Sequence, residues 1–253
     1  MKRFLGYGLL GLAAFLFFML MEAPAGIVMG LLGQRLSGLN VQSVRGTALD
    51  GAAHGVRWRT LDLEQVAWRW RPFALLMARL EYGLTVTAPE ITLTGRTGIS
   101  LDRQVQFHDL TGHLPLATLG VLARQPLLPA QGMVEFDSLQ LRLNDAGRPL
   151  VAQGRVRLLK VRANLGQPLE LGDFEIQLHN ADASGIQGLC KDTGGPLLLT
   201  GTLTLAPDGR YRFNGQFAVR DAANQTLRQA LQPLGPPNND GQWPFNFSGT
   251  LPF

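Results

Sequence analysis

The residue types that most often catalyse reactions or bind metals are scarce in this chain. Four histidines and one cysteine occur among its 253 residues. His108 and His113 lie five positions apart with Asp109 between them, a spacing that could begin a metal site. A zinc centre needs three or four ligands, and the sequence nearby supplies no further histidine or cysteine. We interpret both histidines as polar residues at strand ends, and we predict no metal site.

Cys190 precedes Lys191 within Gly188–Gly195, and a neighbouring lysine can lower the pKa of a thiol. A nucleophilic cysteine also needs a base, and this segment contains no histidine. With one cysteine, the chain cannot form an internal disulfide. We interpret Cys190 as a small, half-buried apolar residue, and we expect the surrounding glycines to form tight turns.

No other pattern indicates chemistry. Gly51–Gly55 is rich in glycine, but it lacks the lysine and the following helix of a phosphate-binding loop. The signature motifs of serine hydrolases and of zinc proteases do not occur in the sequence. The sequence therefore predicts a protein that is not an enzyme and has no catalytic, cofactor-binding or metal-binding residues.

The charge distribution argues against a nucleic-acid partner. The net charge is +4, and charged residues make up 17% of the chain. Nucleic-acid binding needs a cluster of basic residues, because the phosphate backbone dominates affinity. The arginines are instead spread singly along the chain, as at Arg45, Arg57, Arg103, Arg142, Arg162 and Arg212. This spacing is typical of the solvated faces of strands.

The first twenty-two residues predict a membrane anchor. Phe4–Met21 contains no charged residue and follows Lys2 and Arg3. As a helix it would be about 27 Å long, close to the hydrocarbon thickness of a bilayer. The basic flank favours a cytoplasmic N-terminus, so residues 1–22 are expected to be a cytoplasmic stub and a single transmembrane helix of the bacterial inner membrane. The alternative is a signal peptide cleaved at Ala23–Ala25, and both interpretations export the rest of the chain.

Residues 23–40 are expected to connect the anchor to the exported body. The apolar segment within them could form a short helix that continues from the membrane. Its glycines at positions 26, 30 and 33 weaken that prediction, although small residues at this spacing also let helices pack closely.

From Val41 onward, apolar and polar residues alternate, which is the pattern of half-buried strands. Leu61 and Leu63 alternate in one phase and Val66, Trp68 and Trp70 in the other, so we expect a β-bulge between them. Further strands are predicted around residues 80–86, 91–93, 101–107, 134–136, 139–143, 151–161, 169–171, 174–178, 199–205 and 211–219, with a last strand in which Trp243, Phe245, Phe247, Leu251 and Phe253 share one face.

Turn and helix signals separate these strands. Gly95–Gly98 and Asn144–Gly147 are predicted turns, and Pro207–Gly209 is a strong hairpin signal. Short helices are predicted at Phe73–Ala78 and Pro115–Leu122. The most convincing helix runs from Asp221, its predicted N-terminal cap, through Leu227, Leu231 and Leu234.

Strands about ten residues apart, without long helices between them, predict a mainly β fold. We expect one long antiparallel meander, curled or folded on itself, with a few short helices and the N-terminal transmembrane helix. Residues 41–253 would form this periplasmic β-rich domain.

The order of several short motifs resembles the N component of the general (type II) secretion pathway. The motifs span nearly the whole chain: Arg45–Gly51, Val66–Pro72 followed by Leu75–Leu76, Pro149–Gly154, Thr193–Gly201, Leu205–Tyr211, Leu231–Gly235, Asp240–Gly241 and Phe247–Leu251. The layout is also similar, more loosely, to envelope proteins of the AsmA and TamB type, whose curled sheets are thought to carry lipid.

The resemblance implies an accessory or structural component of the secretion apparatus. Its partners would be other components of that apparatus and the inner membrane, with no catalytic residue and no cofactor. The alternative is a lipid-binding or lipid-transfer groove, with phospholipid as its partner. An outer-membrane barrel is disfavoured, because three tyrosines are too few for its aromatic girdles. Pro244 and Pro252 fit an edge strand in each case.

Overall fold

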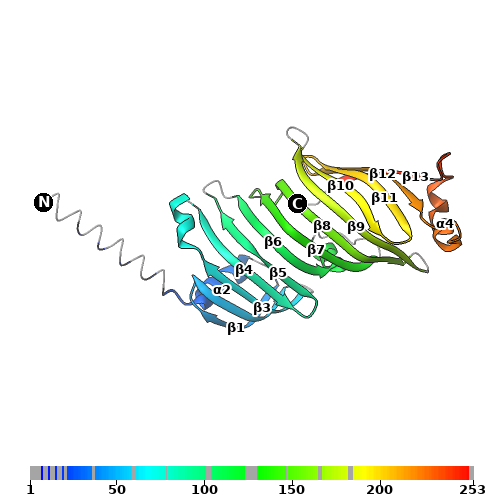
Figure 1. Cartoon of the computed structure of the whole chain (residues 1–253). Helices are drawn as coiled ribbons and strands as arrows, with labels where there is room; N and C mark the ends of the chain where they lie inside the picture. The colour runs from blue at the N-terminus through cyan, green and yellow to red at the C-terminus, as the bar shows by residue number, and fades with distance from the viewer. Residues whose placement is uncertain are drawn as a thin grey trace.

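The computed structural model describes residues 7, 11, 15, 19, 22–35, 38–58, 61–77, 79–100, 104–122, 130–145, 147–164, 167–181 and 185–250. It confirms the predicted meander: thirteen antiparallel strands pair in chain order, from β1 at one edge to β13 at the other (Figure 1). The predicted hairpin at Pro207–Gly209 is present, with Gly209 donating its backbone N–H to the Ala206 carbonyl at 2.9 Å.

The strands are long in the middle of the sheet and shorter toward its edges. They are β1 (Leu39–Gly46), β2 (Asp50–Trp58), β3 (Leu61–Trp70), β4 (Leu80–Ala88), β5 (Ile91–Ile99), β6 (Val105–Pro115), β7 (Ala130–Leu143), β8 (Pro149–Asn164), β9 (Pro168–Ala181), β10 (Gly185–Gly194), β11 (Leu197–Leu205), β12 (Arg210–Val219) and β13 (Trp243–Thr250).

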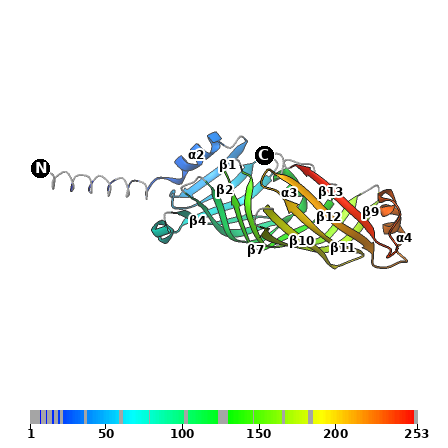
Figure 2. The same cartoon turned by 90° about the horizontal axis from the view of Figure 1, so that it is seen from above.

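β-Bulges in three consecutive strands accompany the curvature of the sheet. Asp109 in β6, Ser138 in β7 and Lys160 in β8 each have a φ of 51°, and the strand register shifts at each of them. A bulge bends its strand and increases the local twist. Seen from above, the sheet curls so that both of its ends lie on the same side of the middle strands (Figure 2).

The predicted bulge in β3 is wrong. Leu63 pairs with Val56, and Val66 pairs with Ala53, so the β2–β3 pairing keeps one register on both sides of the phase change. Gly55 lies at this point with a φ of 61°. The backbone of β2 thus reorients at a glycine, which adopts positive φ at little cost.

The helices are short, as predicted. They are α2 (Ala25–Arg35), the 3-10 helix η1 (Pro72–Met77), α3 (Leu116–Leu122), α4 (Gln225–Leu231) and the 3-10 helix η3 (Gln232–Leu234). Asp221 is not the cap of α4, contrary to the prediction. The cap is Asn224, whose side-chain oxygen accepts the Leu227 N–H, whereas the Asp221 carboxylate accepts the Ala223 N–H in a preceding turn.

Two predictions that assigned glycines to turns are corrected. Gly95–Gly98 lies inside β5, and the turn before that strand is at Pro89–Glu90. Gly188 lies inside β10, where an added Cβ would be 3.0 Å from Ile176 Cγ2, so this glycine makes room for a side chain of the neighbouring strand. Gly195 alone occupies the expected tight turn, with a φ of 116°.

The core lies on one face of the sheet, in two clusters. The first is centred on Val134, with α3 contributing Leu116 and Leu119. The second surrounds Phe174, with α4 contributing Leu227 and Leu231. Short helices therefore cover parts of this face.

The predicted N-terminal anchor is not confirmed. Among the described residues, no helix combines the length and apolar character required to cross a membrane. Most of Phe4–Met21 lies outside the described residues, as do several residues assigned to predicted elements: Ala78, Leu101–Arg103, Ala146 and Leu251–Phe253.

Candidate interaction surface

One row of apolar residues crosses the whole sheet. Residues paired across neighbouring strands point to the same face, so the strand registers identify every member of the row. The row contains only apolar residues and glycine: Val44, Ala53, Val66, Val86, Leu93, Gly112, Phe136, Val156, Ile176, Cys190, Gly201, Gly215 and Phe245. We call the face that carries this row the inner face, because α3 and α4 pack on it.

The neighbouring row points to the opposite face, which we call the outer face. It is polar from β1 to β12 and ends in a proline: Ser43, His54, Gln65, Thr87, Thr92, His113, Glu135, Arg157, Glu175, Lys191, Thr200, Gln216 and Pro244. Adjacent residues of one strand thus point to different surfaces, one to the apolar inner face and the next to the polar outer face.

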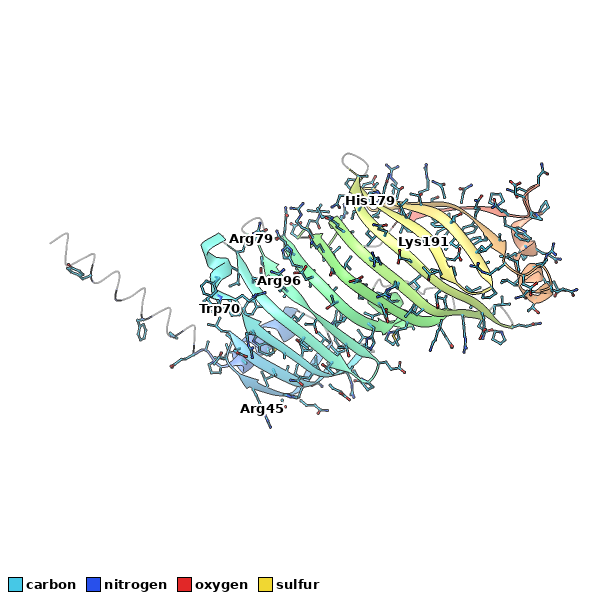
Figure 3. The ribbon with its side chains drawn as sticks, viewed as in Figure 1. Arg45, Trp70, Arg79, Arg96, His179 and Lys191 are labelled. Carbon is cyan, nitrogen blue, oxygen red and sulfur yellow. The ribbon has the colours of Figure 1, made fainter. Side chains whose placement is uncertain are left out.

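Ion pairs link the middle strands across the outer face. Glu175 of β9 lies 3.6 Å from Arg155 of β8 and 3.0 Å from Lys191 of β10. Arg157 lies 3.4 Å from Glu135 of β7. No sequence pattern predicts this network, because only the register brings these charges together. Figure 3 shows Arg96 of β5 and Lys191 of β10 on separate strands of the sheet.

The inner face becomes aromatic at the β13 end. Phe213 lies over a floor of glycines: a Cβ added to Gly201 would be 2.5 Å from its ring, and one added to Gly215 would be 2.8 Å away. Phe245 stacks with Phe247 at 6.3 Å between ring centroids and contacts Phe217 at 5.2 Å. Glycines and aromatic rings therefore complement one another on β11–β13.

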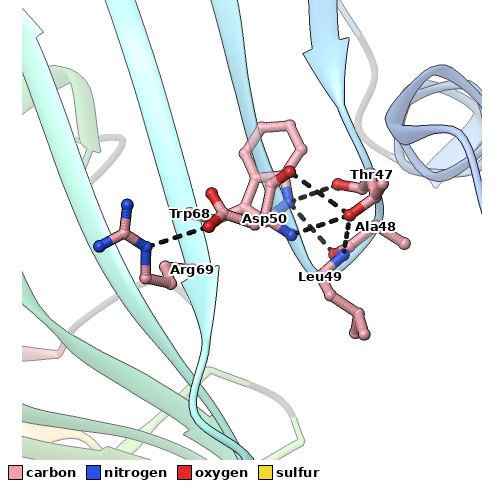
Figure 4. A network of polar contacts seen from close by, with 6 residues as sticks. All are labelled: Thr47, Ala48, Leu49, Asp50, Trp68 and Arg69. Carbon is pink, nitrogen blue, oxygen red and sulfur yellow. Dashed lines mark hydrogen bonds and ion pairs between the residues drawn. The ribbon is translucent and has the colours of Figure 1, made fainter. Parts of the chain in front are cut away.

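Two separate sequence motifs meet at the β1–β2 turn (Figure 4). Trp68 Nε1 donates to the carbonyls of Thr47 at 3.3 Å and Ala48 at 3.1 Å. Thr47 Oγ1 accepts the backbone N–H of Asp50 at 3.1 Å, and Arg69 Nε donates to Asp50 Oδ2 at 3.1 Å. Arg69 is exposed, as the alternation in β3 predicts, whereas Trp68 is only half-buried on the opposite face. The motif residues thus have a structural role in holding β3 against this turn.

A second network closes the turn between β10 and β11. Arg220 forms an ion pair with Asp192 and donates from Nε to the Gly195 carbonyl at 2.8 Å. Asp192 Oδ1 also accepts the Leu199 N–H at 3.2 Å. These bonds fix the glycine turn next to α4.

The structure places Cys190 and Lys191 on opposite faces. Cys190 is 8% exposed and lies in the inner row between Ile176 and Gly201, whereas Lys191 pairs with Glu175 on the outer face. Burial raises the pKa of the Cys190 thiol to about 11. A thiol with this pKa is protonated and unreactive at neutral pH, in keeping with the structural interpretation from sequence.

The histidines do not converge. His108 lies near Gln106, at 3.3 Å between their side chains, and His113 lies opposite Thr92 in the β5–β6 pairing. Within the described part of the chain, no three histidine, cysteine or acidic residues are grouped so that they could hold a metal.

The comparisons with known proteins point to one family. The family model described as type II secretion system (T2SS), protein N, matches residues 37–246. A type II secretion system protein N of Vibrio cholerae is 28% identical over 99% of this chain and 100% of its own length. Proteins of the same name are 28% identical in Klebsiella pneumoniae, over 98% of this chain, and 25% identical in Aeromonas hydrophila, over 99%. No solved structure matches.

Proposed function

The chain belongs to the type II secretion system protein N family, and we propose from this premise that it is a non-enzymatic accessory component that contributes an extended β-sheet to the secretion apparatus. The match over residues 37–246 carries the proposal, because it includes β1 to β12 and the beginning of β13. Such a sheet suits a structural role: its inner face stabilises the fold, and its outer face and edges stay available to other components of the apparatus.

The proposal includes a location. Residues 1–22 would anchor the chain in the inner membrane. Residues 23–40 would connect this anchor to the β-rich domain of residues 41–253, which would lie in the periplasm. The uncharged stretch Phe4–Met21 after Lys2 and Arg3 supports this topology. Alkaline phosphatase fused after residue 40 should be active. N-terminal sequencing of the membrane-bound protein should find Met1, and a sequence that starts at Gly26 would contradict the anchor.

A deletion and complementation experiment tests the role in secretion. In cells that assemble the apparatus, loss of this chain should reduce the amount of a secreted marker protein in the medium, and a plasmid copy should restore it. Unchanged secretion without the chain would overturn the proposed function. The purified protein should contain no stoichiometric phospholipid.

A lipid groove is the second candidate, and a specific observation favours it. Several large apolar residues of the inner face, among them Leu141, Phe213 and Phe247, are only partly buried. Apolar surface of this kind can be covered by acyl chains. If the chain carries lipid, it should purify with phospholipid, and Asp at Leu141 or Phe213 should remove it. Arg142→Asp and Arg212→Asp are matched controls, because these neighbours are exposed outer-face residues.

A further inference from the structure

The backbone of β13 has a free side. Among the described residues, β12 is its only strand neighbour. Two backbone hydrogen bonds identify the residues of β12 that bond toward β11. Ala206, just after β11, donates its N–H to the Arg210 carbonyl at 2.8 Å, and Arg220 donates its N–H to the carbonyl of Pro196, just before β11, at 2.9 Å. Because bonding direction alternates along a strand, the even-numbered residues of β12 bond toward β11. Its odd-numbered residues therefore bond toward β13, where they pair with odd-numbered residues.

The even-numbered residues of β13 consequently direct their backbone groups away from the sheet. These residues are Pro244, Asn246, Ser248 and Thr250. Pro244 has no N–H and occupies a position that needs none for pairing with β12, in agreement with this assignment. The remaining three residues present N–H and C=O groups that a further strand could pair with.

This edge lacks the features that usually prevent strand addition. Natural edge strands carry charges or bulges, or are covered by other elements. β13 contains no charged residue, and its eight pairs with β12 run without a register shift. Only Pro244, at its beginning, blocks addition. Phe247 on this strand is 51% exposed.

The opposite edge is better protected. β1 carries Arg45, and α2 packs beside it. Near the end of β1, Pro24 forms a bridge with Thr47, and Ala48 donates its N–H to the Ala23 carbonyl at 2.8 Å. Strand addition is therefore favoured at β13.

The side chains around the edge define the chemistry of its occupant. On the inner face, a new strand would place its side chains beside Phe245 and Phe247, which favours apolar residues. On the outer face, Arg212 pairs with Ser248 in the register, is exposed, and has no ion-pair partner within the described residues. Arg212 and Ser248 line an open hollow of about 500 Å³, where an acidic side chain of the new strand could reach the guanidinium.

We propose that the free edge of β13 adds an extended segment of another secretion component, with apolar residues on one face and an acidic residue on the other. This inference rests on the proposed function. Twelve strand spacings, about 58 Å along the curled sheet, separate the edge from β1, the strand nearest in sequence to the proposed anchor. A second copy of this chain fits less well, because its own β13 contains no acidic residue that could pair with Arg212.

Cross-linking in cells that assemble the apparatus tests the proposal. A photo-reactive benzoylphenylalanine at Phe247 of the full chain should give an adduct with another component, and mass spectrometry should locate the link in an extended segment of it. Ser248→Pro removes one outward N–H and should lower the adduct yield at least about tenfold. Ser248→Ala keeps the N–H and should leave the yield unchanged. Arg212→Glu should reduce the yield several-fold, whereas Arg142→Glu should not.

Three results would overturn the proposal: no adduct, an adduct between two copies of this chain, or a yield that neither Ser248→Pro nor Arg212→Glu lowers. Arg212→Glu leaves the backbone intact, so it decides the question if Ser248→Pro unfolds the protein. These results are independent of the proposed function, which fails only if deleting the entire chain leaves secretion unchanged.

Discussion

Val134 and Glu135 are consecutive residues of β7 with opposite surroundings. Val134 is completely buried at the centre of the larger core cluster. Glu135 lies on the outer face, where it pairs with Arg157 at 3.4 Å and its side chain is 34% exposed. The same contrast continues along the sheet, so stability should depend on the inner face, while the outer face should tolerate change. Four predictions test this comparison.

The largest effect is expected at the centre of the inner face. Val134→Asp places a carboxylate where the described core offers only apolar neighbours, and should lower the free energy of unfolding by about 4 kcal/mol or more. Urea denaturation of the purified protein measures this loss. The matched control, Glu135→Gln, should cost less than about 1 kcal/mol. Equal losses at the two positions would contradict the assignment of the faces.

Trp68→Ala should have the next largest effect. It removes a half-buried ring and both hydrogen bonds to the β1–β2 turn, and should cost about 3 kcal/mol. Arg69→Ala, next to it on the outer face, loses only the exposed ion pair with Asp50 and should cost less than about 1 kcal/mol. An unchanged melting temperature of Trp68→Ala would show that this face of β3 is not packed as described.

Leu227→Ala measures how much the α4 cover contributes. Leu227 is 2% exposed in the second core cluster, and its truncation should cost about 2–3 kcal/mol. Leu189→Ala is the control: this leucine is 50% exposed on the outer face, and its loss should change stability by no more than about 0.5 kcal/mol. Melting curves of the two variants, recorded side by side, provide the test.

The smallest effect is expected at Cys190. A pKa of about 11 leaves roughly a thousandth of the thiol ionised at pH 8, so iodoacetamide should modify the native protein at least about a hundredfold more slowly than the unfolded chain. Cys190→Ser should change neither secretion nor migration on non-reducing gels. A disulfide-linked dimer that disappears in this variant would refute the structural role of Cys190.

The local sequence was sufficient to predict whether most segments form strands, helices or turns. Alternation at Leu80–Val86 and the Pro207–Gly209 turn both specify structure within a few residues, and both predictions are confirmed. The predictions were wrong where contacts with residues distant in the chain determine the local structure. Gly95–Gly98 has turn composition, but Gly95 lies against Leu110 of the next strand, where an added Cβ would be 3.1 Å from its Cα. Asp221 is a good cap by type, yet Asn224 has the bond.

The sequence by itself determined a mainly β chain, its alternating faces and its membership of a family, because composition, periodicity and motif order are local properties. Only the tertiary structure decided the register, and the register decided everything that depends on neighbours across strands. It placed Phe213 over Gly201 and Gly215, linked Glu135, Arg157 and Glu175 into one charged surface, and left the outward edge of β13 without a strand neighbour among the described residues. In the sheet, residues far apart in the chain become neighbours through hydrogen bonds between strands, which a sequence pattern within one strand cannot specify.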